Sequence, residues 1–216
     1  GSQAGQSTQG AYSISFGAQA GQDAQGATAV AIGLYAGNST QGANAVAIGN
    51  TSGLNNQGAN AVAIGYKAGN STQGVDAIAI GYEAGYTQQH IRTVAIGYQA
   101  GQTNQGTGSI SMGYQAGKGT QGSNAVAIGF LAGNSDQEIS SIAIGTQAGE
   151  SSQGEYSISI GTQAGQGTQG SQSISMGNAA GQNSQGANSV AIGTSAGQYS
   201  QGSASVGIGY QAGYTQ

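Results

Sequence analysis

Small and large residues alternate along the chain in short runs that recur every 16 positions. In Ala45-Val46-Ala47-Ile48 each aliphatic side chain follows an alanine, and a glycine closes the run. A period of two predicts a β-strand with Val and Ile on one face and Ala or Ser on the other. Helix is excluded because glycine is too frequent and the apolar spacing never matches 3.6 residues. The closing glycine recurs without insertion or deletion at Gly1, Gly17, Gly33, Gly49, Gly65, Gly81, Gly97, Gly113, Gly129, Gly145, Gly161, Gly177, Gly193 and Gly209.

A spacing that stays constant over the whole chain predicts stacked coils. Surface loops tolerate changes in length, so a globular domain with loops would not keep this register. Counted from the closing glycine as position 1, the repeat reads G-x-x-A-G-x-x-x-Q-G-x-x-[AS]-[VI]-[AS]-[IMF], with scattered exceptions. Sixteen residues suffice for two short strands and two tight turns. We therefore expect an all-β fold, a parallel β-roll or β-solenoid of about 13 coils, as one repeat domain over residues 1–216.

Two features of the coil follow less directly from the pattern. The second strand is expected just after the glycine, as in Tyr98-Gln99-Ala100, with the Gln-Gly step at a corner. The sequence does not determine which face of the strand points inward. If Val and Ile fill the coil, the flat Ala/Ser face is free to press against another chain; if the faces are exchanged, the aliphatic ridge is free instead. Since the repeat runs to both ends without a capping segment, we expect an excised piece of a longer fibre.

Composition and charge exclude several classes of protein. The chain has 43 glycines but no proline and no Gly-X-Y triplet, so it is not collagen. Without cysteine there are no disulfides and no zinc-thiolate sites. The sequence contains no run of 18 apolar residues, so it predicts no membrane span. The net charge of −4, with only Lys67, Arg92 and Lys118 as bases, argues against nucleic acid or anionic lipid as a partner.

Glutamine at position 9 is the most regular polar feature. A primary amide both donates and accepts, so stacked glutamines can bond to one another along the coils. A repeated ligand-binding amide is the alternative, but its surroundings lack the varied groups of a binding site. The predicted structural ladder consists of Gln9, Gln25, Gln41, Gln57, Gln73, Gln89, Gln105, Gln121, Gln137, Gln153, Gln169, Gln185 and Gln201.

Stacking also predicts aromatic and ionic contacts between coils. Position 2 holds five consecutive aromatic residues, which we expect to form a stripe that stabilises the coils or, alternatively, a platform for glycan rings or ordered water. Lys67 precedes Glu83 at the same position, and Asp76 precedes Arg92, so two ion pairs between coils are expected. The aromatic stripe consists of Tyr66, Tyr82, Tyr98, Tyr114 and Phe130.

No constellation of residues supports catalysis, a cofactor or a strong metal site. The single histidine and seven scattered carboxylates do not form an acid–base pair, so we expect no enzyme. Asp136 and Glu138 could ligate a hard cation only weakly, and a solvated corner is the simpler interpretation. Two corners replace the usual Gln-Gly step and are either tolerated drift or recognition sites. These irregular corners contain His90, Ile91 and Arg92 in one coil, and Glu138 and Ile139 in another.

The strand and corner pattern resembles a known family. Ser189-Val190-Ala191-Ile192-Gly193, followed by Ala196, is similar to the head repeats of YadA-type trimeric autotransporter adhesins and to repeats in fibre proteins of phages and large viruses. The resemblance implies a left-handed roll, a homotrimer, and attachment to a host surface, matrix or glycan ligand from a cell surface or virion. The unit here has 16 residues, whereas the family's unit is usually near fourteen.

The expected function is therefore a structural and adhesive fibre segment, a rigid rod without chemistry of its own. The alternative is an ice-binding solenoid that uses the tyrosine stripe or the small Ala/Ser face. The mixed turn residues argue against ice binding, because an array that matches ice should be more regular.

Overall fold

The computed structural model describes residues 1–214, and within this range every regular element is a β-strand. Each coil contributes one two-residue and one three-residue strand, and each strand pairs in parallel with its counterpart 16 residues away. For example, Gln41 pairs with Gln57, and Ala47 with Ala63. This confirms the predicted parallel β-solenoid with about 13 coils. The left-handed sense implied by the resemblance stays a prediction.

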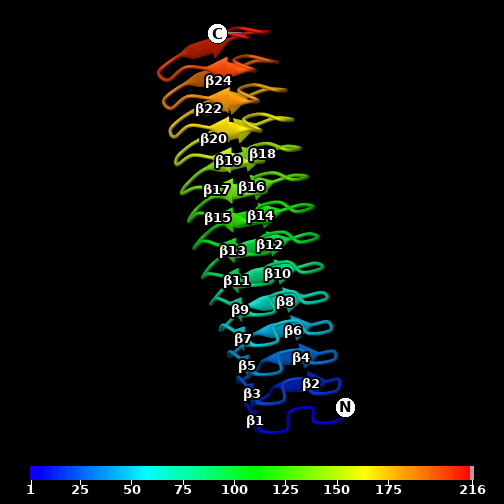
Figure 1. Cartoon of the computed structure of the whole chain (residues 1–216). Helices are drawn as coiled ribbons and strands as arrows, with labels where there is room; N and C mark the ends of the chain where they lie inside the picture. The colour runs from blue at the N-terminus through cyan, green and yellow to red at the C-terminus, as the bar shows by residue number, and fades with distance from the viewer. Residues whose placement is uncertain (215–216) are drawn as a thin grey trace. The chain divides into compact units, whose positions relative to one another are not determined.

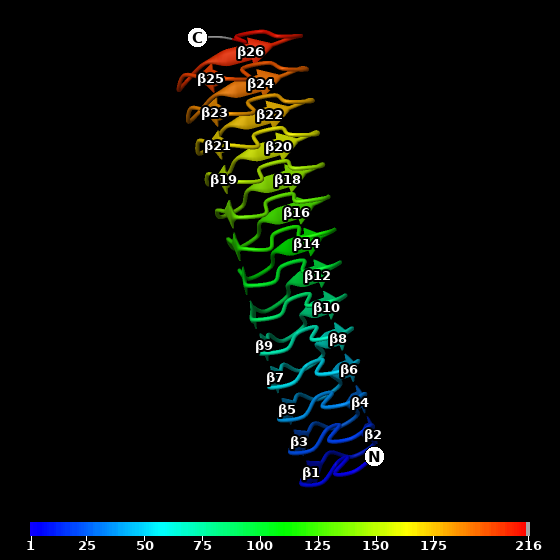
Figure 2. The same ribbon diagram turned by 45° about the vertical axis from the view of Figure 1, so that its right-hand side comes forward.

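The strands lie in two compact units, one over residues 1–108 and one from residue 109 onward. In the first unit the short strands follow the order β1-β3-β5-β7-β9-β11-β13 and the long strands β2-β4-β6-β8-β10-β12. In the second unit the orders are β15-β17-β19-β21-β23-β25 and β14-β16-β18-β20-β22-β24-β26. Successive long strands such as β4, β6 and β8 lie side by side (Figure 1), and the short strands lie across the coil from them (Figure 2).

The long strands cover positions 14–16 of the repeat. They are β2 (Ile14–Phe16), β4 (Val30–Ile32), β6 (Val46–Ile48), β8 (Val62–Ile64), β10 (Ile78–Ile80), β12 (Val94–Ile96), β14 (Ile110–Met112), β16 (Val126–Ile128), β18 (Ile142–Ile144), β20 (Ile158–Ile160), β22 (Ile174–Met176), β24 (Val190–Ile192) and β26 (Val206–Ile208).

The short strands cover positions 8–9. They are β1 (Thr8–Gln9), β3 (Ala24–Gln25), β5 (Thr40–Gln41), β7 (Asn56–Gln57), β9 (Thr72–Gln73), β11 (Gln88–Gln89), β13 (Asn104–Gln105), β15 (Thr120–Gln121), β17 (Asp136–Gln137), β19 (Ser152–Gln153), β21 (Thr168–Gln169), β23 (Ser184–Gln185) and β25 (Ser200–Gln201).

The location of this second strand corrects the sequence analysis. Tyr98-Gln99-Ala100 forms a turn, and the strand of that coil is β13. The reason is the backbone at position 3, where Gln99 has a φ of +51°. That left-handed conformation cannot continue a strand. As a result, the position-9 glutamines lie in strands, and the aromatic residues of position 2 lie on turns.

Small residues fill the space between the two sheets. Ala45 and Ala47 are fully buried, whereas Val46 and Ile48 lie outward and are half-buried. The interior is narrow, because a Cβ added to Gly53 would lie 3.3 Å from the Cβ of Ala47. A branched aliphatic side chain does not fit there. The structure thus resolves the open choice of faces: Ala and Ser point inward and the aliphatic ridge points outward.

The turns depend on left-handed backbone at fixed positions. At position 1, Gly49 has a φ of +130°, and a Cβ there would lie 2.5 Å from the carbonyl oxygen of Gly65 in the next coil. Positions 3 and 12 are left-handed too although they hold other residues, for example Lys67 at +54° and Asp76 at +59°. Each such residue costs about 1–2 kcal/mol, less for asparagine, so the coil must be held in place by contacts with its neighbours.

Candidate functional site

Apart from Gln9, which is exposed, the position-9 glutamines lie inside the coils and join the two sheets. From Gln25 to Gln201 their side chains are at most 5% exposed. The Nε2 of Gln41 donates to the carbonyl oxygen of Val30 at 2.8 Å, and the same bond to the opposite sheet recurs at 2.7–2.9 Å in the other buried glutamines. The sequence pattern does not predict this bond across the coil. It places the Gln-Gly step at a corner, whereas the glutamine lies in a strand.

Bonds between successive glutamines also occur, but not in every coil. Gln57 donates to the Oε1 of Gln73 at 3.2 Å, and Gln137 donates to Gln153 at 3.1 Å. In other coils a serine at position 15 is the donor to the glutamine oxygen, as Ser159 is to Gln169 at 2.5 Å. From Gln25 onward the amides are therefore buried inside the coil, and their Nε2 groups are bonded to the opposite strand.

The aromatic residues of position 2 stack between coils. Ring centroids are 5.2 Å apart for Tyr66 and Tyr82, and 5.0 Å for Tyr82 and Tyr98; in the second unit Tyr114 and Phe130 are 5.1 Å apart. The ring planes deviate by 7–23° from parallel. Ring faces within each stack thus contact one another, and the side chains are 41–48% exposed through their edges. This geometry offers a row of ring edges and polar groups rather than a flat platform of ring faces.

The charged residues near this stack have partners other than those expected. The Lys67 ammonium lies over the ring of Tyr66, 5.1 Å from its centroid, and 5.8 Å from that of Tyr86. A hydrogen bond to the Tyr66 side chain is the largest cause that raises the pKa of Lys67 above its usual value, and Glu83 contributes least. The close partners of the Lys67 ammonium are therefore the two tyrosine side chains, and Glu83 contributes only a Coulombic attraction.

The two carboxylates of the expected ion pairs accept hydrogen bonds from side-chain amide groups. The Oε2 of Glu83 accepts hydrogen bonds from Gln99 at 2.9 Å and from Gln102 at 2.8 Å. The Oδ1 of Asp76 accepts one from Asn60 at 3.0 Å. The second predicted pair, Asp76 with Arg92, is likewise replaced by a bond to an uncharged donor in the neighbouring coil.

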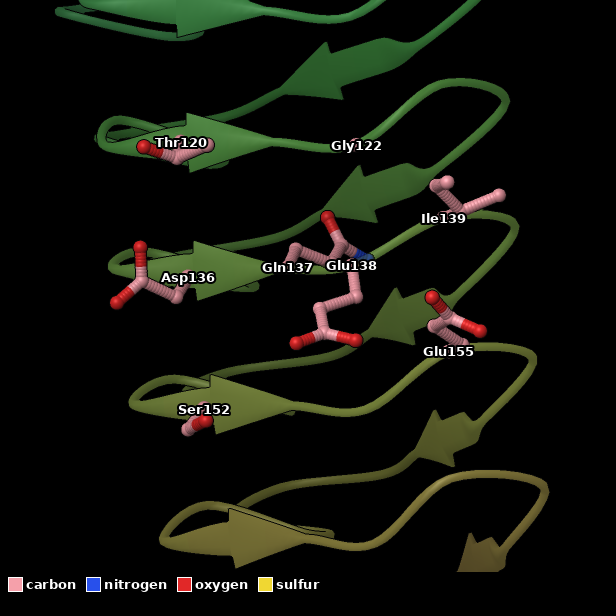
Figure 3. A pocket seen from close by; sticks show the side chains of 8 residues that line it. All are labelled: Thr120, Gly122, Asp136, Gln137, Glu138, Ile139, Ser152 and Glu155. Carbon is pink, nitrogen blue, oxygen red and sulfur yellow. The ribbon is translucent and has the colours of Figure 1, made fainter.

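Both irregular corners border hollows in the surface. In the second unit a hollow of about 470 Å³ is lined by side chains of three coils, among them Asp136, Glu138, Ile139 and Glu155 (Figure 3). Ile139 is 44% exposed, and the carboxylates of Glu138 and Glu155 come from neighbouring coils. In the first unit a smaller hollow of about 170 Å³ is lined by His90 and Ile91, whereas Arg92 does not line it. These are the places where the repeating surface is interrupted.

Among the described residues the potential metal-ligating side chains do not cluster. Within residues 1–214, no three His, Cys, Asp or Glu side chains gather closely enough to hold a metal ion. The same range contains no helix of the length and apolarity needed to cross a membrane. Asp136, Glu138 and Glu155 line one hollow, but their carboxylates do not gather closely enough to hold a metal ion.

Comparisons of the chain with protein-family models, with curated proteins and with solved structures find no match.

Proposed function

We propose that the chain is a structural fibre segment that associates with copies of itself and presents a surface for attachment. The observation that carries this proposal is the inverted distribution of apolar residues. Among the described residues every buried hydrophobic side chain is an alanine, and the large aliphatic side chains of the long strands lie on the outer face of their sheets. In β10, for example, Ala79 is buried and Ile78 and Ile80 point outward.

This outer face is suited to pack against another sheet. Positions 14 and 16 of the long strands carry Val, Ile, Met or Phe and no charge. Burying one such side chain completely contributes about 1.5–3 kcal/mol, and sheet faces stack about 10 Å apart. An alanine interior contributes much less, while each ordered residue costs about 1–2 kcal/mol of backbone entropy. Association through this face would supply the missing stabilisation.

The resemblance to trimeric adhesin heads supports three copies. We expect light scattering to give the mass of three chains. Ile64→Lys with Ile80→Lys places two charges on the outer long-strand face and should lower that mass to one chain. Thr72→Lys, on the outer side of the short strand β9, is the matched control and should leave it unchanged. A wild-type chain that is monomeric at every concentration tested would contradict the proposal.

Attachment is proposed at the irregular corners, in an extracellular setting on a cell or virion surface. Ile139 and the carboxylates around it interrupt an otherwise uniform surface, and recognition sites commonly lie on such irregular loops. The test measures binding of the assembled protein to immobilised glycans and matrix proteins. Glu138→Gly with Ile139→Ala restores the regular corner and should abolish any binding, whereas Val75→Ala in a regular corner should not. Binding that survives the restored corner would place attachment elsewhere.

Ice binding is the alternative function and has less support. The Ala/Ser face is buried, so it is not available to ice. The tyrosine stripe offers ring edges and polar groups rather than a flat array of ring faces. We expect no thermal hysteresis, and a clear hysteresis would favour the ice-binding alternative over the fibre.

A further inference from the structure

We propose that Tyr66, Tyr82 and Tyr98 form an oxidative cross-linking site, at which a dityrosine bond joins neighbouring coils. Three phenols of the first unit stack with centroid distances of 5.2 and 5.0 Å and nearly parallel rings. Their side chains are 41–42% exposed on turns, so an oxidant in solution can reach them. Neither the fibre proposal nor the fold requires phenols here, because stacked phenylalanines would stabilise the coils equally well.

The positions of these tyrosines are set by the repeat. Position 2 follows the glycine of position 1, and equivalent residues of parallel coils lie at the strand spacing of about 4.8 Å. Tyr35 shows what an isolated tyrosine looks like in the same unit. It is 38% exposed, but its equivalents in the adjoining coils are Gln19 and Thr51. The exposure of Tyr35 is thus nearly equal to that of the stacked tyrosines, but these have a second phenol at contact distance and Tyr35 has none at the equivalent positions.

The chemistry requires a peroxide and a haem peroxidase as oxidant. Each of two phenols loses one electron and its hydroxyl proton, which gives two phenoxyl radicals. The ring carbons ortho to the oxygens then join, and the hydrogen on each of these carbons moves to the phenol oxygen to restore the aromatic ring. Overall, two tyrosines and one hydrogen peroxide give one dityrosine and two water molecules.

Stacking makes the reaction within one chain faster than the reaction between chains. Groups held together by a short tether have an effective concentration of about 1 mM, so at about 1 µM chain the internal reaction is favoured roughly a thousandfold. Because Tyr82 is shared, the expected products are a bond from Tyr82 to Tyr66 or from Tyr82 to Tyr98. Each product closes a loop of one coil and should raise the urea concentration needed for unfolding.

The experiment treats the full chain with hydrogen peroxide and a haem peroxidase and follows dityrosine by fluorescence. Peptide mapping by mass spectrometry then locates the bonds. Tyr199→Phe is included in every variant, since Tyr199 and Tyr214 form a second close phenol pair with their hydroxyls 3.2 Å apart. We expect cross-linked peptides that pair Tyr82 with Tyr66 or Tyr98, at a yield that does not change with chain concentration.

Two further variants make the test decisive. Tyr82→Phe keeps the stacked ring but removes the phenol, and should reduce cross-linked peptides that contain Tyr66 by about tenfold or more. Tyr35→Phe removes one phenol of similar exposure and should leave them unchanged. Circular dichroism verifies that both variants are folded. Oxidation that yields no Tyr82 bond, bonds mainly between chains, or undiminished Tyr66 peptides in Tyr82→Phe would overturn the proposal.

Discussion

The interiors of the two units differ although their coils have the same backbone. In the first unit, position 15 is alanine in every coil from β4 to β12, and β2 alone carries a serine there, Ser15, which donates to the Oε1 of Gln25. In the second unit three coils carry serine there, and Ser111, Ser159 and Ser175 donate to the Oε1 of the glutamine ten residues later. The buried Oε1 atoms of Gln41, Gln57 and Gln89, all in the first unit, have no such donor.

This difference shows how a narrow interior is stabilised. Alanines bury little apolar area, so the hydrogen bonds of the buried amides carry more of the stability than in an ordinary core. A buried acceptor without a partner costs about 1–3 kcal/mol. The Oε1 of a buried glutamine accepts a hydrogen bond from one of two donors, a serine on the opposite strand or the glutamine of the preceding coil. Gln73, whose coil has alanine, takes the second way.

The largest expected effect concerns the backbone that both units share. Gly49→Ala in the first unit and Gly145→Ala in the second would place a Cβ 2.5 and 2.6 Å from a carbonyl oxygen of the next coil. We expect each to lower the free energy of unfolding by more than about 3 kcal/mol, from clash and backbone strain together. Urea unfolding followed by circular dichroism measures it.

The control for the glycine variants separates strain from clash. Gly209 has a similar φ of +121°, but a Cβ there meets nothing within 4 Å. Gly209→Ala should therefore cost only the strain, about 1–3 kcal/mol. Equal losses at Gly209 and Gly49 would mean that the contact between coils is not what excludes a side chain.

The next effect removes a donor from the second unit. Ser159→Ala should leave the Oε1 of Gln169 without its bond and lower the free energy of unfolding by about 1–3 kcal/mol. Ser157→Ala, in the same coil, removes a bond to the backbone oxygen of Gly154 and should cost about 0.5–1.5 kcal/mol. If Ser159→Ala costs no more than its control, the difference between the two interiors has no energetic meaning.

A smaller effect of opposite sign is expected in the first unit. Ala47→Ser would supply a donor to the unpaired Oε1 of Gln57 and should raise the free energy of unfolding by about 1 kcal/mol. Ala63→Ser is the matched control, since Gln73 already accepts a bond from Gln57, and should change little. Equal shifts at the two positions would contradict the role assigned to serine.

The sequence predicted the stacked coils, but not which residues fill their interior or where the second strand lies. The constant spacing required parallel stacking, and the alternation in Ala45-Val46-Ala47-Ile48 required a strand. This alternation does not determine which face points inward. With the alanines inside, the aliphatic ridge is left on the outer face, whereas large apolar residues are usually buried. The second strand was misplaced because positive φ at position 3 falls on residues such as Gln99, which give no sign of it.

The candidate site was predictable to a similar degree. Register alone placed Tyr66, Tyr82 and Tyr98 in one stack, as the structure has them. The carboxylates of the expected ion pairs have amide groups as close partners, because register fixes the positions of Cα atoms only. The direction of a long side chain depends on neighbours from other positions, such as Gln102 beside Glu83.

The smallest expected effect concerns the first unit, and it is a dependence of the free energy of unfolding on pH. Glu83 is the largest cause that raises the pKa of Tyr82 above its usual value of 10.0, and the pKa of Lys67 is raised from 10.5. The folded state thus holds these protons more tightly than the unfolded state does. Their contribution is complete below about pH 10 and is lost as the pH rises through the folded-state pKa values. Stability should therefore decline in alkali.

Glu83→Gln tests this cause in a background of Tyr214→Phe, because a hydrogen bond with Tyr199 raises the pKa of Tyr214 as well. The substitution should lower the pKa of Tyr82, measured by NMR of its ring signal, and should make the decline of stability above about pH 10 shallower. Glu150→Gln, in the second unit, should change neither. Since the groups of the first unit are exposed, the change in slope should be small, and an unshifted Tyr82 titration would show that Glu83 does not control it.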